Sequence, residues 1–163
     1  MPNLTNSEGL HTNAVYGFLN ILFKVLDEEK ADYLAVAFDL KAPTFRHKMF
    51  DAYKGTRKPM PEELHEQVPL MKEVLTAMGV PILTKEGYEA DDILGTIAKR
   101  EQKDGYEVTI LSGDRDLLQL SDTHIRICLP KTSRGTTEVH NYYPEDVIRE
   151  YQVTPEQFIE VKA

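Results

Sequence analysis

Apolar and polar positions alternate along the chain in patterns that predict helices and strands in turn. Apolar residues recur every three or four positions over 15–25, 62–78 and 90–103, which is the period of helices with one buried face. A polar loop ends at Thr12-Asn13, a suitable N-terminal cap for the first of these helices. Short apolar runs between the helices predict strands, the first of them buried on both faces. These strands are 33–39, 80–84 and 106–112.

The C-terminal third continues the pattern with shorter elements. One or two helical turns are expected over 117–120, and two strands over 124–129 and 136–140 are expected to pair around a turn. Pro144 and Pro155 stand where first helical residues belong, and Thr154 forms a capping box with the glutamine three residues later.

This order of elements determines the expected fold class. Strands alternate with helices at the spacing of crossover connections, which predicts an α/β fold with a mostly parallel, twisted sheet flanked by helices. No repeat or internal linker interrupts the sequence, so residues 1–163 are expected to form one domain. In sheets of this kind, binding sites lie beyond the carboxyl ends of the strands.

Carboxylates occupy several of those strand ends. Asp39 ends the first strand, Asp114 and Asp116 directly follow the third, and three more acids precede or open the helix over 90–103. The six are Asp39, Glu89, Asp91, Asp92, Asp114 and Asp116. Clustered carboxylates need cations or protons, and such hard oxygen ligands suit two or more Mg²⁺ or Mn²⁺ ions of a phosphoryl-transfer site. Each acid also has a purely structural interpretation, as a turn cap or as a favourable charge at a helix N-terminus.

Charge is distributed unevenly along the chain. The formal charge of -8 and a pI near 5.1 argue against a generic polyanion binder. However, 41–58 carries six basic residues and one acid, a charge of +5, so the remainder carries -13. The basic segment also contains Phe45, Phe50 and Tyr53, which suits a phosphate backbone with unpaired, stacked bases. The alternative is a solvated loop whose aromatic rings pack on the core.

Other features of the sequence narrow the setting. The single cysteine, Cys128, lies in an apolar stretch and is expected to be a buried, inert thiol. No apolar run is long enough to span a membrane, and the N-terminus lacks the features of a signal peptide. We therefore expect a cytoplasmic protein with no membrane partner, and a monomer.

Several motifs, in order and with consistent spacing, resemble the 5′-nuclease domain of bacterial DNA polymerase I. This family is related to flap endonucleases, has a PIN-like α/β fold, and cuts 5′ flaps and 5′ ends of DNA with divalent metals. The motifs are Leu4-Thr-Asn-Ser-Glu-Gly9, Ala14-Val-Tyr-Gly-Phe18, Ala37-Phe-Asp39, Thr44-Phe-Arg-His47, Ala52-Tyr-Lys-Gly55, Gly87-Tyr-Glu-Ala-Asp-Asp92, Gly113-Asp-Arg-Asp116 and Leu117-Leu-Gln-Leu120.

The resemblance implies roles for individual residues. The six carboxylates named above would hold the metals, and residues 41–61 would form a basic helical arch through which single-stranded 5′ DNA passes. Lys54 and Arg46 would be catalytic, with Lys54 on the scissile phosphate. Tyr53 would stack on a terminal base. Backbone contacts would come from Arg57 and Lys58.

Two features of the family pattern do not occur in these 163 residues. A strand of the type Leu-Ile-Asp-Gly-Asn would precede Leu4, and a Gly-Asp…Asp-Asn segment with a helix-hairpin-helix-like part would follow the region of Phe158. The resemblance thus implies a nuclease core truncated at both ends, lacking one metal-binding Asp at the start and two at the end. Activity of this chain alone is expected to be weak or absent.

The sequence therefore predicts a metal-dependent 5′-3′ exonuclease or 5′-flap endonuclease of DNA replication and repair, which a polymerase domain would accompany in a longer chain. One alternative is a catalytically silent DNA-binding module. A further alternative, a Mg²⁺-dependent phosphatase with Asp39 as nucleophile, is disfavoured because Asp39 is followed by Leu40-Lys41 rather than by an acid two residues on.

Overall fold

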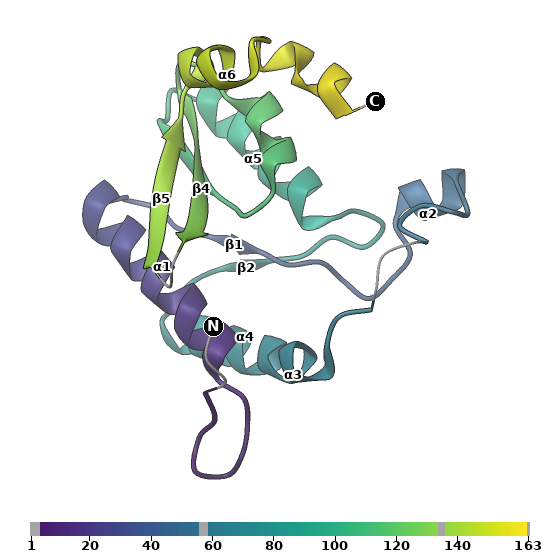
Figure 1. The fold of residues 1–163 in the computed structure, drawn as a ribbon, viewed down its shortest axis with the longest axis vertical. Coiled ribbons are helices and arrows are strands. Elements are labelled where there is room, and N and C mark those ends of the chain that lie inside the picture. The colour runs from purple at the N-terminus through teal and green to yellow at the C-terminus, as the bar shows by residue number, and fades with distance from the viewer. Residues whose placement is uncertain (1–3, 56–58, 134–135, 163) are drawn as a thin grey trace. The chain divides into compact units, whose positions relative to one another are not determined.

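The computed structural model describes residues 4–55, 59–133 and 136–162. It divides into two compact units, Met1–Ala90 and Asp91–Ala163, and Figure 1 labels most of their helices and strands. Helices and strands alternate in both units, which confirms the α/β class. The described strands form two separate sheets, one of two strands and one of three.

Two long helices, α1 and α4, and a short parallel strand pair are the main elements of the first unit. Its elements are α1 (Asn13–Glu29), β1 (Val36–Ala37), α2 (Phe45–Met49), α3 (Glu62–His65), α4 (Gln67–Ala77) and β2 (Ile82–Leu83). Val36 pairs with Ile82, and α1 contacts α4. The buried apolar residues of this unit, all on the two long helices, are Val15, Leu22, Val25 and Leu75.

A buried glutamine from α4 caps the N-terminus of α1. The side-chain oxygen of Gln67 accepts the backbone N–H groups of Ala14 at 2.7 Å and Val15 at 3.3 Å. Its amide nitrogen donates to the Asn13 side chain and to the Glu63 carbonyl, so all its hydrogen-bonding capacity is directed at protein groups. The helix starts where the sequence predicts, with Thr12 at the N-cap position. However, the Thr12 side chain makes no cap hydrogen bond, and the free N–H groups are satisfied by Gln67 instead.

The strands of the first unit are shorter and less buried than their sequence predicts. The expected strand 33–39 is regular only at Val36–Ala37, and both residues are half-buried rather than buried. Tyr33 is 76% exposed. Among the described residues β1 pairs with β2 alone, and their ladder comprises two residue pairs.

The helix expected over 62–78 is broken in two. Helix α3 ends at His65 and α4 starts at Gln67. Pro69 explains the break, since it has no N–H to donate to the carbonyl four residues earlier and its ring clashes with that carbonyl. The end of the helix is as expected, with Gly79 in the left-handed conformation (φ +73°).

A three-stranded sheet, two α-helices and two 3-10 helices make up most of the second unit. Its elements are α5 (Ala90–Lys103), β3 (Val108–Leu111), the 3-10 helix η1 (Arg115–Leu120), β4 (Ile125–Ser133), β5 (Thr136–Tyr142), α6 (Pro144–Tyr151) and the 3-10 helix η2 (Glu156–Lys162). β3 pairs with β4 in parallel and β5 pairs with β4 antiparallel, so β4 is central. The expected strand pair and the expected helix over 90–103 are confirmed.

The main apolar core lies in this second unit. It is built from α5, all three strands, η1, α6 and η2: Ala98, Ile110, Leu117, Leu118, Ile125, Ile127, Leu129, Tyr142, Val147 and Phe158. Cys128 is buried as expected, and its thiol donates to the Asn141 side chain at 3.0 Å.

Two predicted helix starts are confirmed. Pro144 is the first residue of α6, and Thr154 and Gln157 each accept the other's backbone N–H. Within the described ranges, no helix has both the length and the apolar character needed to cross a bilayer.

Candidate functional site

Three side chains of the basic segment converge on one carboxylate in the first unit. The Glu89 carboxylate accepts the Lys54 ammonium at 2.7 Å and the Tyr53 hydroxyl at 3.1 Å, and the Arg46 guanidinium lies 3.8 Å away. We call these four residues the Glu89 clasp. The Glu89 side chain is only 13% exposed, so these charges meet where water screens them incompletely. Burial, together with the hydrogen bond to Glu89, raises the pKa of Tyr53 above its usual value, so its hydroxyl stays protonated as a donor.

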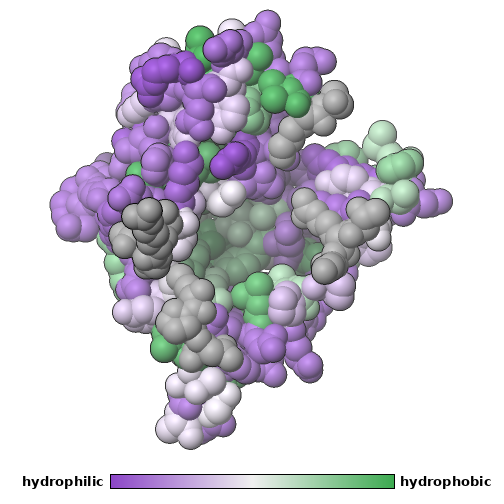
Figure 2. Space-filling model, viewed as in Figure 1, coloured by the Kyte–Doolittle hydropathy of each residue, from purple (hydrophilic) through white to green (hydrophobic). Residues whose placement is uncertain are grey.

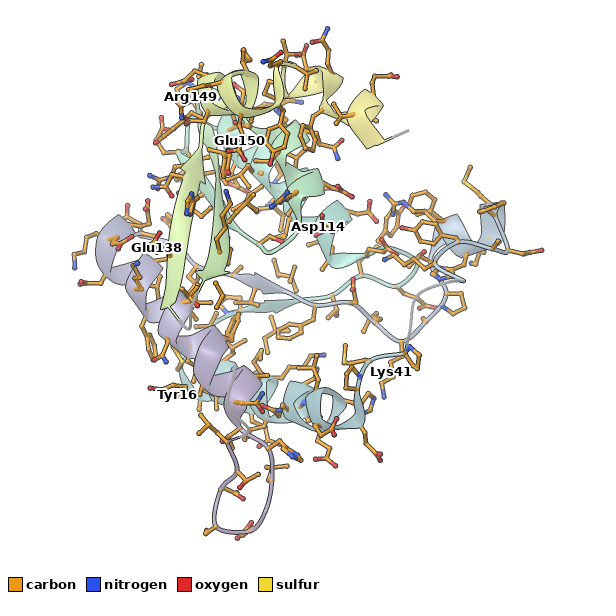
Figure 3. All side chains as sticks on the ribbon, viewed as in Figure 1. Tyr16, Lys41, Asp114, Glu138, Arg149 and Glu150 are labelled. Carbon is orange, nitrogen blue, oxygen red and sulfur yellow. The ribbon has the colours of Figure 1, made fainter. Side chains whose placement is uncertain are left out.

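Helix α2 holds this basic segment against the loop before α5. Thr44 and His47 form a reciprocal cap at the helix start. The N–H of Phe45 donates to the Gly87 carbonyl at 2.8 Å, and the Phe45 ring packs on Tyr88 with centroids 5.6 Å apart. Figure 3 shows the resulting concentration of polar and aromatic side chains beside α2. Residues distant in the sequence are thus fixed together by both backbone and side-chain contacts.

Asp39 joins the same end of the first unit. It follows β1, and its carboxylate accepts the N–H of Ala90, the first residue of α5, at 2.6 Å. One carboxylate oxygen of Asp39 thus has a structural contact at the start of α5, although not as the cap of a local turn. The Asp39 residue is exposed, which leaves carboxylate surface open to solvent.

The remaining four predicted ligands belong to the second unit. Asp91 and Asp92 lie in the first turn of α5, where negative charge is favourable. Asp114, labelled in Figure 3, lies between β3 and η1 and caps η1 by accepting the N–H of Asp116 at 2.9 Å. The N-cap of this short helix is therefore Asp114. The Asp116 side chain is half-buried beside it.

These six residues fit hard divalent cations in their chemistry, because all of them offer carboxylate oxygens. Among the residues that the structure describes, no group of three or more His, Cys, Asp or Glu is arranged to hold a metal ion. In the first unit Glu89 is engaged by cationic side chains, so a metal would have to compete with Lys54 for its oxygens. The six-carboxylate site remains a prediction.

Aromatic residues of the basic segment differ in their availability. The ring of Tyr53, the predicted stacking residue, packs edge-on against His47. The Tyr53 hydroxyl donates a hydrogen bond to Glu89. Met49 and Phe50, at the end of α2, are 81% and 64% exposed, and Figure 2 shows apolar atoms at that outer end among hydrophilic ones. Phe50 is therefore the aromatic ring most open to a base. Its place at the helix end could have indicated this from the sequence. Arg57 and Lys58 lie outside the described residues.

The comparison with protein families is decisive at this point. Residues 1–152 match the model of the 5′-3′ exonuclease, N-terminal resolvase-like domain. The chain belongs to this family. The family recognised from the motifs of the sequence is thereby confirmed.

Curated relatives of the chain are bacterial DNA polymerases. It is 48% identical to DNA polymerase I of Bacillus caldotenax and 48% identical to that of Bacillus subtilis, in each case over 99% of this chain. DNA polymerase I of Caldicellulosiruptor bescii is 40% identical over the whole chain. The chain spans only 18% to 19% of the length of these relatives.

Solved structures share the fold. The 5′-exonuclease of T5 with bound zinc superposes with a TM-score of 0.70 at 23% identity, covering 91% of this chain and 56% of that one. A T5 protein co-crystallised with metal ions gives the same TM-score at 25% identity, covering 91% of this chain and 57% of that one. A bacteriophage T5 flap endonuclease complexed with DNA and metal ions gives 0.67 at 23% identity, with 91% of this chain and 56% of that chain covered.

Proposed function

We propose that this chain carries the core of a metal-dependent 5′-3′ exonuclease or 5′-flap endonuclease that acts on DNA, with weak cleavage expected from these 163 residues alone. Membership of the exonuclease family carries the proposal. The Glu89 clasp supports it, because it places two cationic side chains of the basic segment on Glu89, and Asp39 accepts the N–H of Ala90, the residue that follows Glu89. A phosphodiester needs that combination: cations for its phosphate and carboxylates for the metal ions.

Each predicted site residue has its own role in this reaction. Lys54 and Arg46 bind the phosphate at the site of cleavage and stabilise the negative charge that develops there. Tyr53 and the exposed Phe50 offer rings to unpaired bases. Asp39, Glu89, Asp91, Asp92, Asp114 and Asp116 would hold Mg²⁺ or Mn²⁺, which when bound supplies Lewis-acid stabilisation and lowers the pKa of a coordinated water.

Cleavage of a labelled 5′-flap duplex with Mg²⁺ or Mn²⁺ tests the proposal. The double variant Asp114→Asn with Asp116→Asn is expected to lose cleavage and to keep its affinity for DNA, because it changes metal ligands and leaves the basic segment intact. DNA binding by the wild type without any metal-dependent cleavage would identify a silent DNA-binding module instead. No binding and no cleavage would overturn both interpretations.

Lys54→Ala is a second test, with Lys103→Ala as its matched control. Loss of one phosphate-stabilising donor is expected to lower kcat by about 10²-fold and to reduce the salt slope of DNA affinity by about 1. Lys103 is an exposed base in the last turn of α5, and its removal changes the net charge equally. Equal effects of the two substitutions would remove Lys54 from the interface.

A further inference from the structure

Glu89 has contacts that a metal ligand does not need. Its carboxylate pairs with Lys54 at 2.7 Å and accepts the Tyr53 hydroxyl at 3.1 Å, while Arg46 lies at 3.8 Å. The three partners come from residues 46–54, and Glu89 is 35 positions further along the chain than Lys54. One carboxylate thus gathers the cations that the proposed function assigns to a phosphate.

The backbone at Lys54 indicates that this contact is held against strain. Lys54 has φ +56°, in the left-handed region that side-chain-bearing residues rarely adopt. Such a conformation persists only where surrounding contacts determine it. The ion pair with Glu89 is one such contact. The Lys54 ammonium also lies over the ring of Tyr53, 5.3 Å from its centroid, and the Tyr53 hydroxyl donates to the same Glu89 carboxylate.

DNA would compete directly with Glu89 for these cations. A phosphate group needs the Lys54 ammonium and the Arg46 guanidinium, and both already face a carboxylate that is only 13% exposed. A bound phosphate brings negative charge to the same place, so phosphate and Glu89 cannot both keep close contact with Lys54 without repulsion.

We propose that Glu89 restrains the basic segment in the DNA-free protein and releases Lys54 and Arg46 to backbone phosphates when single-stranded DNA binds. Glu89 is thus a positioning residue for the segment as well as a predicted metal ligand. This inference rests on the proposed function in so far as the competing ligand is DNA. The restraint itself belongs to the free protein.

Hydrogen exchange of the DNA-free protein tests the restraint. Glu89→Gln keeps an oxygen acceptor for Tyr53 but removes the charge, and exchange of the amides over 45–54 is expected to speed up severalfold. Lys54→Met, which removes the other charge, is expected to do the same. The double variant should add little, because both substitutions break one interaction. Exchange rates that stay at the wild-type value in both single variants would overturn the proposal.

Affinity for a single-stranded oligonucleotide in EDTA tests the competition. Glu89→Gln is expected to bind about fivefold more tightly than the wild type, because DNA no longer has to break an ion pair of the strength typical of partly exposed pairs. The matched control is Asp51→Asn, an exposed acid of the same segment with the same change of charge. It is expected to change affinity less than twofold and exchange not at all.

The outcomes separate the inference from the proposed function. Equal gains in affinity for Glu89→Gln and Asp51→Asn would reduce the effect to bulk charge and overturn the competition. Weaker binding by Glu89→Gln would make Glu89 a purely structural support and overturn it too. If no variant binds DNA, the proposed function fails, while the exchange experiment still decides whether Glu89 restrains the segment.

Discussion

The second unit buries a continuous apolar core, whereas the first unit is held to a large extent by polar contacts between segments distant in sequence. Among the described residues, the core cluster of ten apolar side chains lies entirely in Asp91–Ala163. The first unit contributes buried apolar residues only from α1 and α4. Its polar links between distant segments include the Gln67 cap, the Glu89 clasp and the Asp39 contact with Ala90.

The difference shows how stability and candidate chemistry are divided. Apolar burial is insensitive to charged ligands, so the second unit offers a fixed frame for Asp114 and Asp116. Ion pairs and hydrogen bonds respond to salt and competing ligands, so the segment that carries Lys54 can change partners. A unit whose contacts are polar can exchange them for a charged ligand, but such contacts stabilise it less than apolar burial would.

The largest expected effect is a cavity in the core of the second unit. Leu118 is completely buried, and Leu118→Ala is expected to lower the free energy of unfolding by about 3–4 kcal/mol through lost burial and an unfilled cavity. Urea unfolding followed by far-UV circular dichroism measures it. The control Ile148→Ala, at a residue 46% exposed, should cost about 1 kcal/mol or less. Similar costs for both would contradict a core at Leu118.

A smaller effect is expected from removing the polar cap of the first unit. Gln67→Leu leaves the N–H groups of Ala14 and Val15 without their acceptor, and should cost about 2–3 kcal/mol although the substituted residue is apolar and buried. Hydrogen exchange at the start of α1 measures the loss locally. If Gln67→Leu were neutral or stabilising, the first unit would depend on apolar packing after all.

Elements governed by local signals were predictable from the sequence. Helix α5 has the predicted bounds, because an apolar period, acids in its first turn and Gly105 after its end all act within a few residues. The same holds for the Pro144 start of α6. Strand β1 was predicted too long because its extent depends on β2, 46 positions away by their register, rather than on its own composition.

The candidate site was predictable in its members but not in its contacts. Arg46, Lys54 and Glu89 were all singled out, and the structure brings these three together. Their pairing was missed because Glu89 was considered only as a metal ligand, and no local pattern links it to a lysine 35 positions away. The Gln67 cap was missed for the same reason, since it reaches Ala14 across 53 positions.

The smallest expected effect concerns Asp122, a carboxylate of the second unit that several hydrogen-bond donors surround. Asp122 accepts Lys99 at 3.1 Å and the N–H and hydroxyl of Thr123. A hydrogen bond from Gln102, helped by Lys99 and Thr123 and opposed by burial, lowers the pKa of Asp122 well below its ordinary value of 3.8. Its side chain is 35% exposed, so solvent screening keeps the contribution to stability at about 1 kcal/mol.

The pH dependence of that contribution has a definite sign. Because the folded pKa lies below the unfolded one, the stabilisation by Asp122 is complete above about pH 5 and is lost as the pH falls through the folded pKa. Asp122→Asn should therefore lower stability by about 1 kcal/mol at pH 7, and its deficit relative to the wild type should shrink below about pH 4. Thermal unfolding between pH 3 and pH 7 measures this, with the exposed Asp104→Asn as control. A deficit that widens towards acid would mean that Asp122 is not held as a carboxylate by these donors, and the second unit would then rest on its apolar core alone.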